Sequence, residues 1–140
     1  MKKLIICGKG NDQVPLNEIT DDDAEIWLHG TDRRDGADWY FELHGIETGR
    51  ENTIYEIPET VYRAGLPINN TICAMLVCAW LSGYQEIRLC GAPLEAKSEY
   101  QEEKPAVAFI VGFLKGKGIK ITWDEGPQDK GYGRKHDASL

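Results

Sequence analysis

The sequence predicts an α/β domain built on a mostly parallel, five-stranded sheet. Three observations carry this prediction. Short, largely apolar runs recur along the 140 residues, and most of them stop at or near a glycine. Helical patterns separate several of these runs, as in chains that alternate strands and helices. The first run, KLIIC, is almost entirely apolar, which is typical of a strand buried on both faces of a parallel sheet.

Each predicted element follows from its own residues. The first strand, KLIIC, ends at Gly8, and Pro15 suits the first turn of a short helix. The longest apolar run forms a helix that begins after capping residues and ends at Gly83. Strands are expected at residues 3–7, 25–29, 38–43, 86–90 and 119–123, with a brief extra strand considered at 53–57, and helices at 14–20, 58–64, 72–81 and 105–116.

The stretch from residue 69 to 91 reads as a helix start, an apolar helix, a glycine turn and a buried strand. This is half of a βαβ unit, and crossovers between parallel strands are right-handed. If the first three strands wind one way and the last two the other, the strand order is 3-2-1-4-5. Ligands of open α/β sheets bind beside the carboxyl ends of the strands where the order reverses, here between strands one and four.

Two polar segments are expected to meet at that reversal. The loop GKGND follows strand one, and the triplet NNT starts the helix before strand four. Glycines let a backbone approach a phosphate closely, and a helix start offers unpaired N–H groups. Strand punctuation and simple helix capping are the alternatives for these segments. The predicted ligand-binding residues here are Gly8, Lys9, Gly10, Asn11, Asp12, Asn69, Asn70 and Thr71.

Other candidates follow the remaining strands. His44 comes after strand three, and the long loop after strand four contains Glu99 and Tyr100, which are expected to close over a ligand. His44 and Glu99 are the candidate general bases. The loop at residues 32–35, DRRD, either meets a ribose or second phosphate or is only a solvated charged loop.

Composition limits the class of partner. The net charge of −7 and the lack of a basic stripe make the chain a poor candidate for nucleic-acid binding, which depends on Lys and Arg side chains that neutralise phosphates. A small anionic ligand is compatible with this charge, because backbone N–H groups can bind it. No secretory signal and no apolar run of membrane length is present, so we expect a cytoplasmic protein without a membrane partner.

The length predicts one domain at residues 1–123, followed by a flexible polar tail at 124–140. The four cysteines are expected to be buried, reduced thiols, with Cys7 and Cys90 at similar height on adjacent strands. No metal site or cofactor is indicated. A homo-oligomer would be unsurprising in so small a domain.

Several segments of the chain carry a family resemblance. The segments KLIICGKGND, WYFELH, NNTICAMLVCAWLSGYQEIRLCG, SEYQEEKP and FLKGKGIKITW resemble small Rossmann-like proteins of tailed bacteriophages and prophages. This resemblance implies a three-layer Rossmann-like fold and the cytoplasm of a bacterial host. The loop GKGND and the stretch from residue 69 to 91 are also similar to bacterial lipooligosaccharide sialyltransferases, in which the matching segments hold a cytidine nucleotide. Carried over, those positions are residues 8–12 and 69–71, while Gly91-Ala92-Pro93 lacks the acid of those enzymes.

Three functions remain open. The first is binding of a nucleotide or nucleotide-derived small molecule, with sequestration of a host defence signal as its phage role. The second is a small transferase or hydrolase that acts on an activated nucleotide or nucleotide-sugar. The third is a structural or interaction module with a vestigial pocket.

Overall fold

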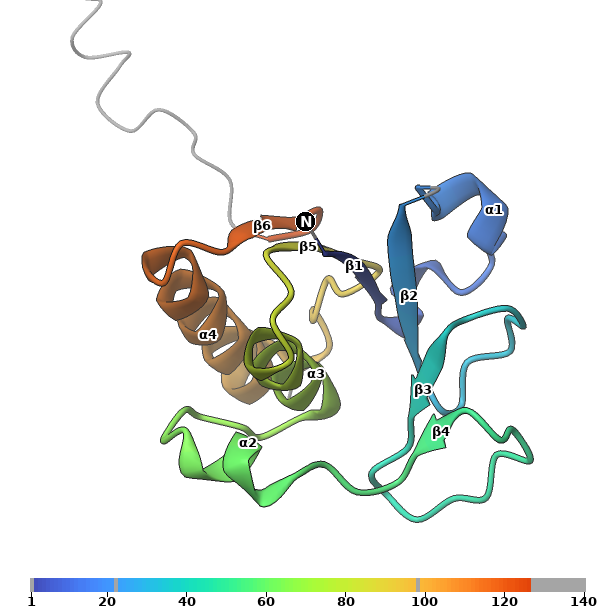
Figure 1. Cartoon of the computed structure of the whole chain (residues 1–140), viewed down its shortest axis with the longest axis horizontal. Coiled ribbons are helices and arrows are strands. Elements are labelled where there is room, and N and C mark those ends of the chain that lie inside the picture. The colour runs from blue at the N-terminus through green and yellow to red at the C-terminus, as the bar shows by residue number, and fades with distance from the viewer. Residues whose placement is uncertain (1, 22, 98, 127–140) are drawn as a thin grey trace, which may run out of the picture.

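Strand β1 (Lys3–Cys7) lies inside a six-stranded sheet whose strands are all parallel, in the order β4-β3-β2-β1-β5-β6. The computed structural model describes residues 2–21, 23–97 and 99–126 (Figure 1). The other strands are β2 (Ala24–His29), β3 (Trp39–Phe41), β4 (Thr53–Ile54), β5 (Glu86–Cys90) and β6 (Lys120–Trp123). The helical segments are η1 (Lys9–Asn11), α1 (Leu16–Ile19), α2 (Glu59–Arg63), α3 (Thr71–Leu81), η2 (Glu99–Glu103) and α4 (Lys104–Gly116).

The predicted five-stranded sheet with order 3-2-1-4-5 was wrong in strand number and at one edge. Residues Thr53 and Ile54 form a sixth strand, β4, that pairs with Tyr40 and Phe41 of β3. Two residues are too few to show any periodicity, so tertiary pairing decides this strand. The five expected segments keep their predicted neighbours, and the order still reverses between β1 and β5.

The two faces of the sheet are covered unequally. Successive side chains of a strand point to opposite faces, so Leu4 and Ile6 join the larger core under α3 and α4. Helix α3 is buried along nearly its whole length, as its apolar sequence predicts. Figure 1 shows α3 and α4 side by side against the sheet and the short α1 apart from them.

The second face carries a smaller core. Ile5 and Cys7 pack there with Ile19 of α1 and Tyr40 of β3. This cover extends over β1, β2 and β3 but leaves polar side chains of β5 and β6 exposed, among them Arg88. The layers above and below the sheet are therefore of very different size.

The register at the centre of the sheet confirms one prediction. Cys7 of β1 is directly opposite Cys90 of β5, and their Sγ atoms are 3.4 Å apart. Cys7, Cys73 and Cys90 are buried and Cys78 is half-buried, all as free thiols. The carboxyl ends of β1 and β5 therefore lie side by side, which places the loops that follow them at one edge.

The expected tail starts at Asp124, and the structure describes its first three residues. Asp124 continues the ladder by donating its N–H to the carbonyl of Leu89 at 2.9 Å, and Gly126 turns back on Trp123. The Glu125 carboxylate accepts hydrogen bonds from the N–H groups of Gly91 and Ala92. These three residues belong to the folded domain, and residues 127–140 lie outside the described part.

Candidate functional site

A cleft of about 580 Å³ opens at the carboxyl edge of the sheet, where the strand order reverses. It lies between the loop after β1, the start of α3 and the segment that follows β5. Many of the predicted site residues line it together: Gly8, Lys9, Gly10, His44, Asn69, Asn70, Thr71 and Glu99. The topology therefore brings the two predicted binding segments and both candidate general bases to one place.

Other predicted residues lie elsewhere. Asn11 and Asp12 are not part of the cleft wall. The Oδ1 atom of Asn11 is buried against Gly91 and has no hydrogen-bond partner among the described residues. Asp12 donates its N–H to the carbonyl of Lys9 at 3.2 Å, which closes the turn. Tyr100 belongs to η2, and its side chain lies outside the described part.

The loop after β1 is tied to the end of β5. The N–H groups of Gly8 and Gly10 donate to the carbonyls of Cys90 and Gly91, both at 2.8 Å. A Cβ atom on Gly10 would approach the Gly91 carbonyl oxygen to 2.8 Å and Pro93 to 2.7 Å. The glycines therefore serve a close approach between two chain segments, and these two N–H groups already have acceptors.

A buried ion pair also holds the loop after β1 in place. Arg34 forms two hydrogen bonds with the carboxylate of Asp32, at 3.0 and 2.7 Å, and the Asp32 side chain is fully buried. Its Nη1 atom also donates to the carbonyls of Asn11 and Val14 at 3.1 and 3.2 Å. Burial alone would raise the pKa of Asp32, but the hydrogen bonds from Arg34 outweigh it and lower that pKa. The segment DRRD is therefore a structural clamp for the loop after β1.

The start of α3 is organised differently. Asn70 is the N-cap, and its Oδ1 atom accepts a hydrogen bond from the N–H of Cys73 at 3.0 Å. The N–H groups of Thr71 and Ile72 precede the first intrahelical bond, which joins Ala74 to the Asn70 carbonyl. Both residues line the cleft. This helix start can donate to a ligand without giving up its cap.

The hydroxyl of Thr71 adds a further donor. Thr71 is 8% exposed, and the described part of the chain records no hydrogen bond to its hydroxyl. Its neighbour Asn69 is less available, because its Nδ2 donates to the carbonyl of Glu102 at 2.9 Å. That bond joins η2 to the start of α3 and so closes one side of the cleft.

Charges of opposite sign line the cleft. Lys9 lies on the wall formed by the loop after β1, while Glu99, Glu102 and Glu103 come from η2. Burial raises the pKa of Glu103, and the neighbouring carboxylates Glu99 and Glu102 raise it further. A ligand would meet the cation of Lys9 on the wall formed by the loop after β1, and both N–H donors and carboxylate acceptors on the wall where η2 joins the start of α3.

Two histidines complete the polar lining of the cleft. His29 and His44 both face the cleft, and burial lowers the pKa of His29, which keeps its imidazole neutral at pH 7. Glu42 is buried, and its carboxylate accepts hydrogen bonds from the N–H groups of His44 and Ile46 at 2.7 and 3.1 Å. Glu42 thus fixes the backbone that carries His44.

Comparisons with protein-family models, with curated proteins and with solved structures give no match. The geometry of the cleft is therefore the basis for any functional assignment. Within residues 2–21, 23–97 and 99–126, no group of three or more His, Cys, Asp or Glu side chains is placed to hold a metal ion. No helix in the same part of the chain is long and apolar enough to cross a membrane.

Sequence reasoning gave several cleft residues no binding role. They include Thr31, Gly91, Pro93, Glu102 and Glu103. Position alone could have indicated Thr31 and Gly91, since they follow the carboxyl ends of β2 and β5, the two strands that flank β1. The glutamates carried no such signal, because a polar loop was expected where η2 forms a helical turn that leads into α4.

Proposed function

We propose that this chain is a Rossmann-like domain that binds a nucleotide or nucleotide-derived small molecule in the cleft. The observation that carries the proposal is the coincidence of the strand-order reversal with a cleft that exposes the start of α3. Ligands of open α/β sheets bind at such reversals. The first N–H groups of a helix suit an anionic group such as a phosphate.

The proposal places the two ends of the ligand. The anionic group meets the N–H groups of Thr71 and Ile72, the Thr71 hydroxyl and the cation of Lys9. The hydroxyl or amino groups of a sugar or base donate to the carboxylates of η2. The acidic wall disfavours ligands with several negative charges, so a single phosphate with a donor-rich remainder fits best.

The resemblance to phage proteins supports a biological role for this binding, namely sequestration of a host nucleotide signal. A small domain that holds a host nucleotide signal would lower its free concentration without any reaction. This role needs a closed, donor-rich cleft and no catalytic group, and both binding walls of the cleft would serve it.

A thermal-shift panel tests the proposal directly. Nucleoside mono-, di- and triphosphates, nucleotide-sugars, cyclic dinucleotides and ADP-ribose are added in turn. A ligand at about 100 times its Kd raises the free energy of unfolding by about 2.7 kcal/mol. We expect stabilisation by at least one ligand with a single phosphate, reduced in Thr71→Val and Lys9→Met. The matched control Thr20→Val changes an exposed threonine outside the cleft and keeps full binding.

A second candidate function is hydrolysis or group transfer. The observation that favours it is the pair His29 and His44 in the cleft, with His44 positioned through Glu42. A neutral histidine beside a bound phosphate ester can accept a proton from an attacking water or hydroxyl. Incubating the stabilising ligand with the protein and recovering it separates the candidates. Intact ligand supports binding alone, and turnover that is lost in His44→Ala or Glu99→Ala supports an enzyme.

A further inference from the structure

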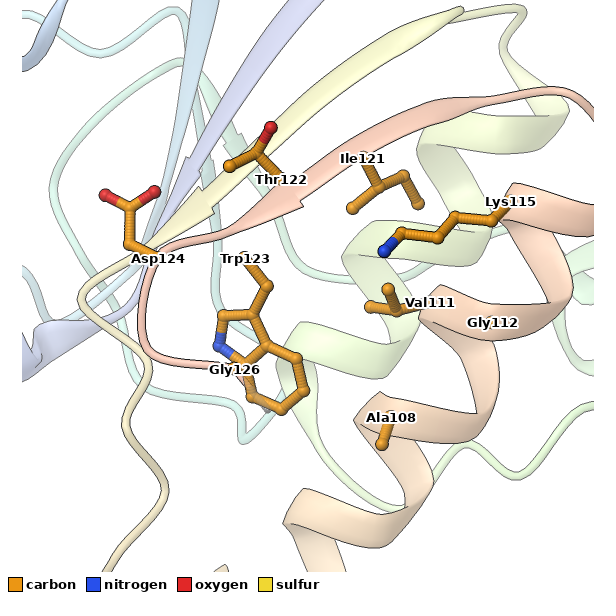
Figure 2. A pocket seen from close by; sticks show the side chains of 9 residues that line it. All are labelled: Ala108, Val111, Gly112, Lys115, Ile121, Thr122, Trp123, Asp124 and Gly126. Atoms are coloured by element: carbon orange, nitrogen blue, oxygen red, sulfur yellow. The ribbon is translucent and has the colours of Figure 1, made fainter. Parts of the chain in front are cut away.

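A second hollow lies on another flank of the molecule, between α4 and the last strand of the sheet. It encloses about 630 Å³, and its lining includes Ala108, Val111, Gly112 and Lys115 of α4 and Ile121 and Trp123 of β6. Figure 2 shows the side chains of Ile121 and Trp123 on the α4 side of the strand and those of Thr122 and Asp124 on the other. This flank thus combines a hollow with the edge of the sheet.

Among the residues that the structure describes, no strand pairs with the outer edge of β6. The N–H groups of Lys120 and Asp124 donate toward β5, to the carbonyls of Gln85 and Leu89 at 3.0 and 2.9 Å. Because successive N–H groups of a strand alternate in direction, those of Ile121 and Trp123 point away from β5. The Trp123 carbonyl accepts a bond from Gly126 at 3.1 Å and keeps a second lone pair. An open edge of this kind is a template for another strand.

We propose that β6 pairs in antiparallel orientation with β6 of a second copy of this chain. In one antiparallel register, two copies of the sequence KITWD, residues 120–124, place favourable side-chain pairs opposite each other. When Ile121 is opposite Trp123 of the second copy, Lys120 is opposite Asp124 and Thr122 is opposite itself. Opposite charges and threonine pairs are favourable cross-strand neighbours. The result is one continuous sheet across a two-fold axis.

The charges beside β6 select this register. Lys120 pairs with Glu86 at 3.3 Å, and Asp124 pairs with Arg88 at 2.7 Å, all on the exposed face of the sheet. Across the two-fold axis, the proposed pairing extends these into an alternating row of Glu86, Lys120, then Asp124 and Arg88 of the second copy. A different register of the two strands breaks this alternation of positive and negative charges. Charge complementarity therefore favours a second copy over an unrelated strand.

Helix α4 permits the approach. Its exposed side next to the hollow carries Ala108 and Gly112, and a Cβ atom on Gly112 would meet nothing within 4 Å. Two such helices would meet small residues at these positions, next to Val111 and Lys115, which line the same hollow.

Sedimentation velocity over a range of concentrations tests the proposal. The full chain is expected to form a concentration-dependent dimer. Lys120→Glu and Asp124→Lys each place like charges opposite one another twice per dimer and should weaken it about tenfold. The double variant Lys120→Glu/Asp124→Lys restores opposite charges across the axis and should restore the dimer. Lys97→Glu makes the same charge change away from β6 and should have no effect.

The double variant separates the interface from the fold. Within one copy it worsens the ion pairs with Glu86 and Arg88, so only pairing between copies can explain a restored dimer. Should a single variant unfold by circular dichroism, Thr122→Lys replaces it, because Thr122 forms no ion pair and faces itself across the axis. A monomer at every concentration, a dimer that the single variants leave unchanged, or a double variant without recovery would each overturn the proposal.

Discussion

The loop after β1 and the start of α3 line the same cleft but differ in what their polar groups do. Both were expected to hold a phosphate with backbone N–H groups. In the structure, Gly8 and Gly10 donate to the end of β5, and the buried pair of Asp32 and Arg34 holds the loop in place. At α3, Asn70 caps one N–H, and Thr71 and Ile72 face the cleft. Of the two segments, the loop supports the architecture and the helix start offers groups to a ligand.

This difference shows what a glycine-rich loop can mean. Glycines are needed wherever a backbone passes close to another atom, and the neighbour can be either a ligand or the chain itself. The sequence GKGND does not distinguish the two. The distinction depends on Gly91 and Pro93, which lie about 80 residues further along the chain and meet the loop only in the folded sheet.

The largest expected effect comes from the clamp under the loop. Asp32→Ala leaves the buried Arg34 guanidinium without its partner and should lower the free energy of unfolding by about 3 kcal/mol. Urea unfolding measures the loss. Asp35→Ala is the matched control, because Asp35 is exposed in the same loop and pairs with Arg50 at the surface. Its effect should stay below about 1 kcal/mol. Equal losses in the two variants would contradict the clamp.

The same pair gives a pH dependence with a defined sign. Hydrogen bonds from Arg34 hold the pKa of Asp32 below its ordinary value, so the carboxylate stabilises the fold at pH above that ordinary value. This contribution is lost as the pH falls through the lowered pKa. We expect the stability difference between the wild type and Asp32→Asn to be largest at pH 7 and to shrink below about pH 4. A difference that grows toward acid would contradict this account.

A smaller loss should follow from crowding the loop itself. In Gly10→Ala the new methyl group presses on Pro93 and the Gly91 carbonyl, which should cost about 1–3 kcal/mol. Gly112→Ala is the control. Its methyl group meets nothing, and replacing a glycine inside α4 should stabilise the helix by about 0.5–1 kcal/mol. Chemical unfolding of the two variants should therefore give changes of opposite sign.

Unlike the loop after β1, the start of α3 should contribute to ligand binding and hardly to stability. Thr71→Val exchanges a hydroxyl that has no recorded partner for a methyl group of similar volume, so Tm should hardly change. Binding should weaken, because the variant removes a donor from the anion side of the cleft. Calorimetric titration with the best ligand of the panel measures the ratio of Kd values. An unchanged Kd would remove Thr71 from the site.

The smallest expected effect concerns the acidic wall. Burial and two neighbouring glutamates raise the pKa of Glu103, so ionising this side chain costs stability in the folded state. The cost is absent below the ordinary pKa of a glutamate and complete above the raised one. Glu103→Gln should therefore raise Tm at pH 7 and leave it nearly unchanged at pH 4. Thermal scans at the two pH values check the sign.

The sequence allowed much of the framework to be predicted. The runs KLIIC and EIRLC and the apolar helix between residues 72 and 81 fixed the strand neighbours around β1, and with them the position of the cleft. A brief strand at 53–57 was considered but left out of the predicted sheet, because the two residues that pair, Thr53 and Ile54, carry no pattern of their own. The helical turn η2 was missed because SEYQEE is as polar as a loop.

The sequence predicted which segments would meet at one edge of the sheet, but not what their polar groups contact there. Side chains such as His44 and Glu99 reached the cleft because strand ends and their loops share one edge. The engagement of Gly8 and the burial of Asp32 depend on contacts between distant segments. A linear sequence does not show whether a polar group faces water or another part of the chain.

The most direct test of the central claim is a backbone amide titration by nuclear magnetic resonance. Inorganic phosphate and adenosine monophosphate are added to the labelled protein, and the amide shifts are followed residue by residue. The account predicts large shifts at Thr71, Ile72 and Lys9, with slow hydrogen exchange and small shifts at Gly8 and Gly10. Large shifts at the two glycines with none at the start of α3, or no shift at any cleft residue, would contradict it.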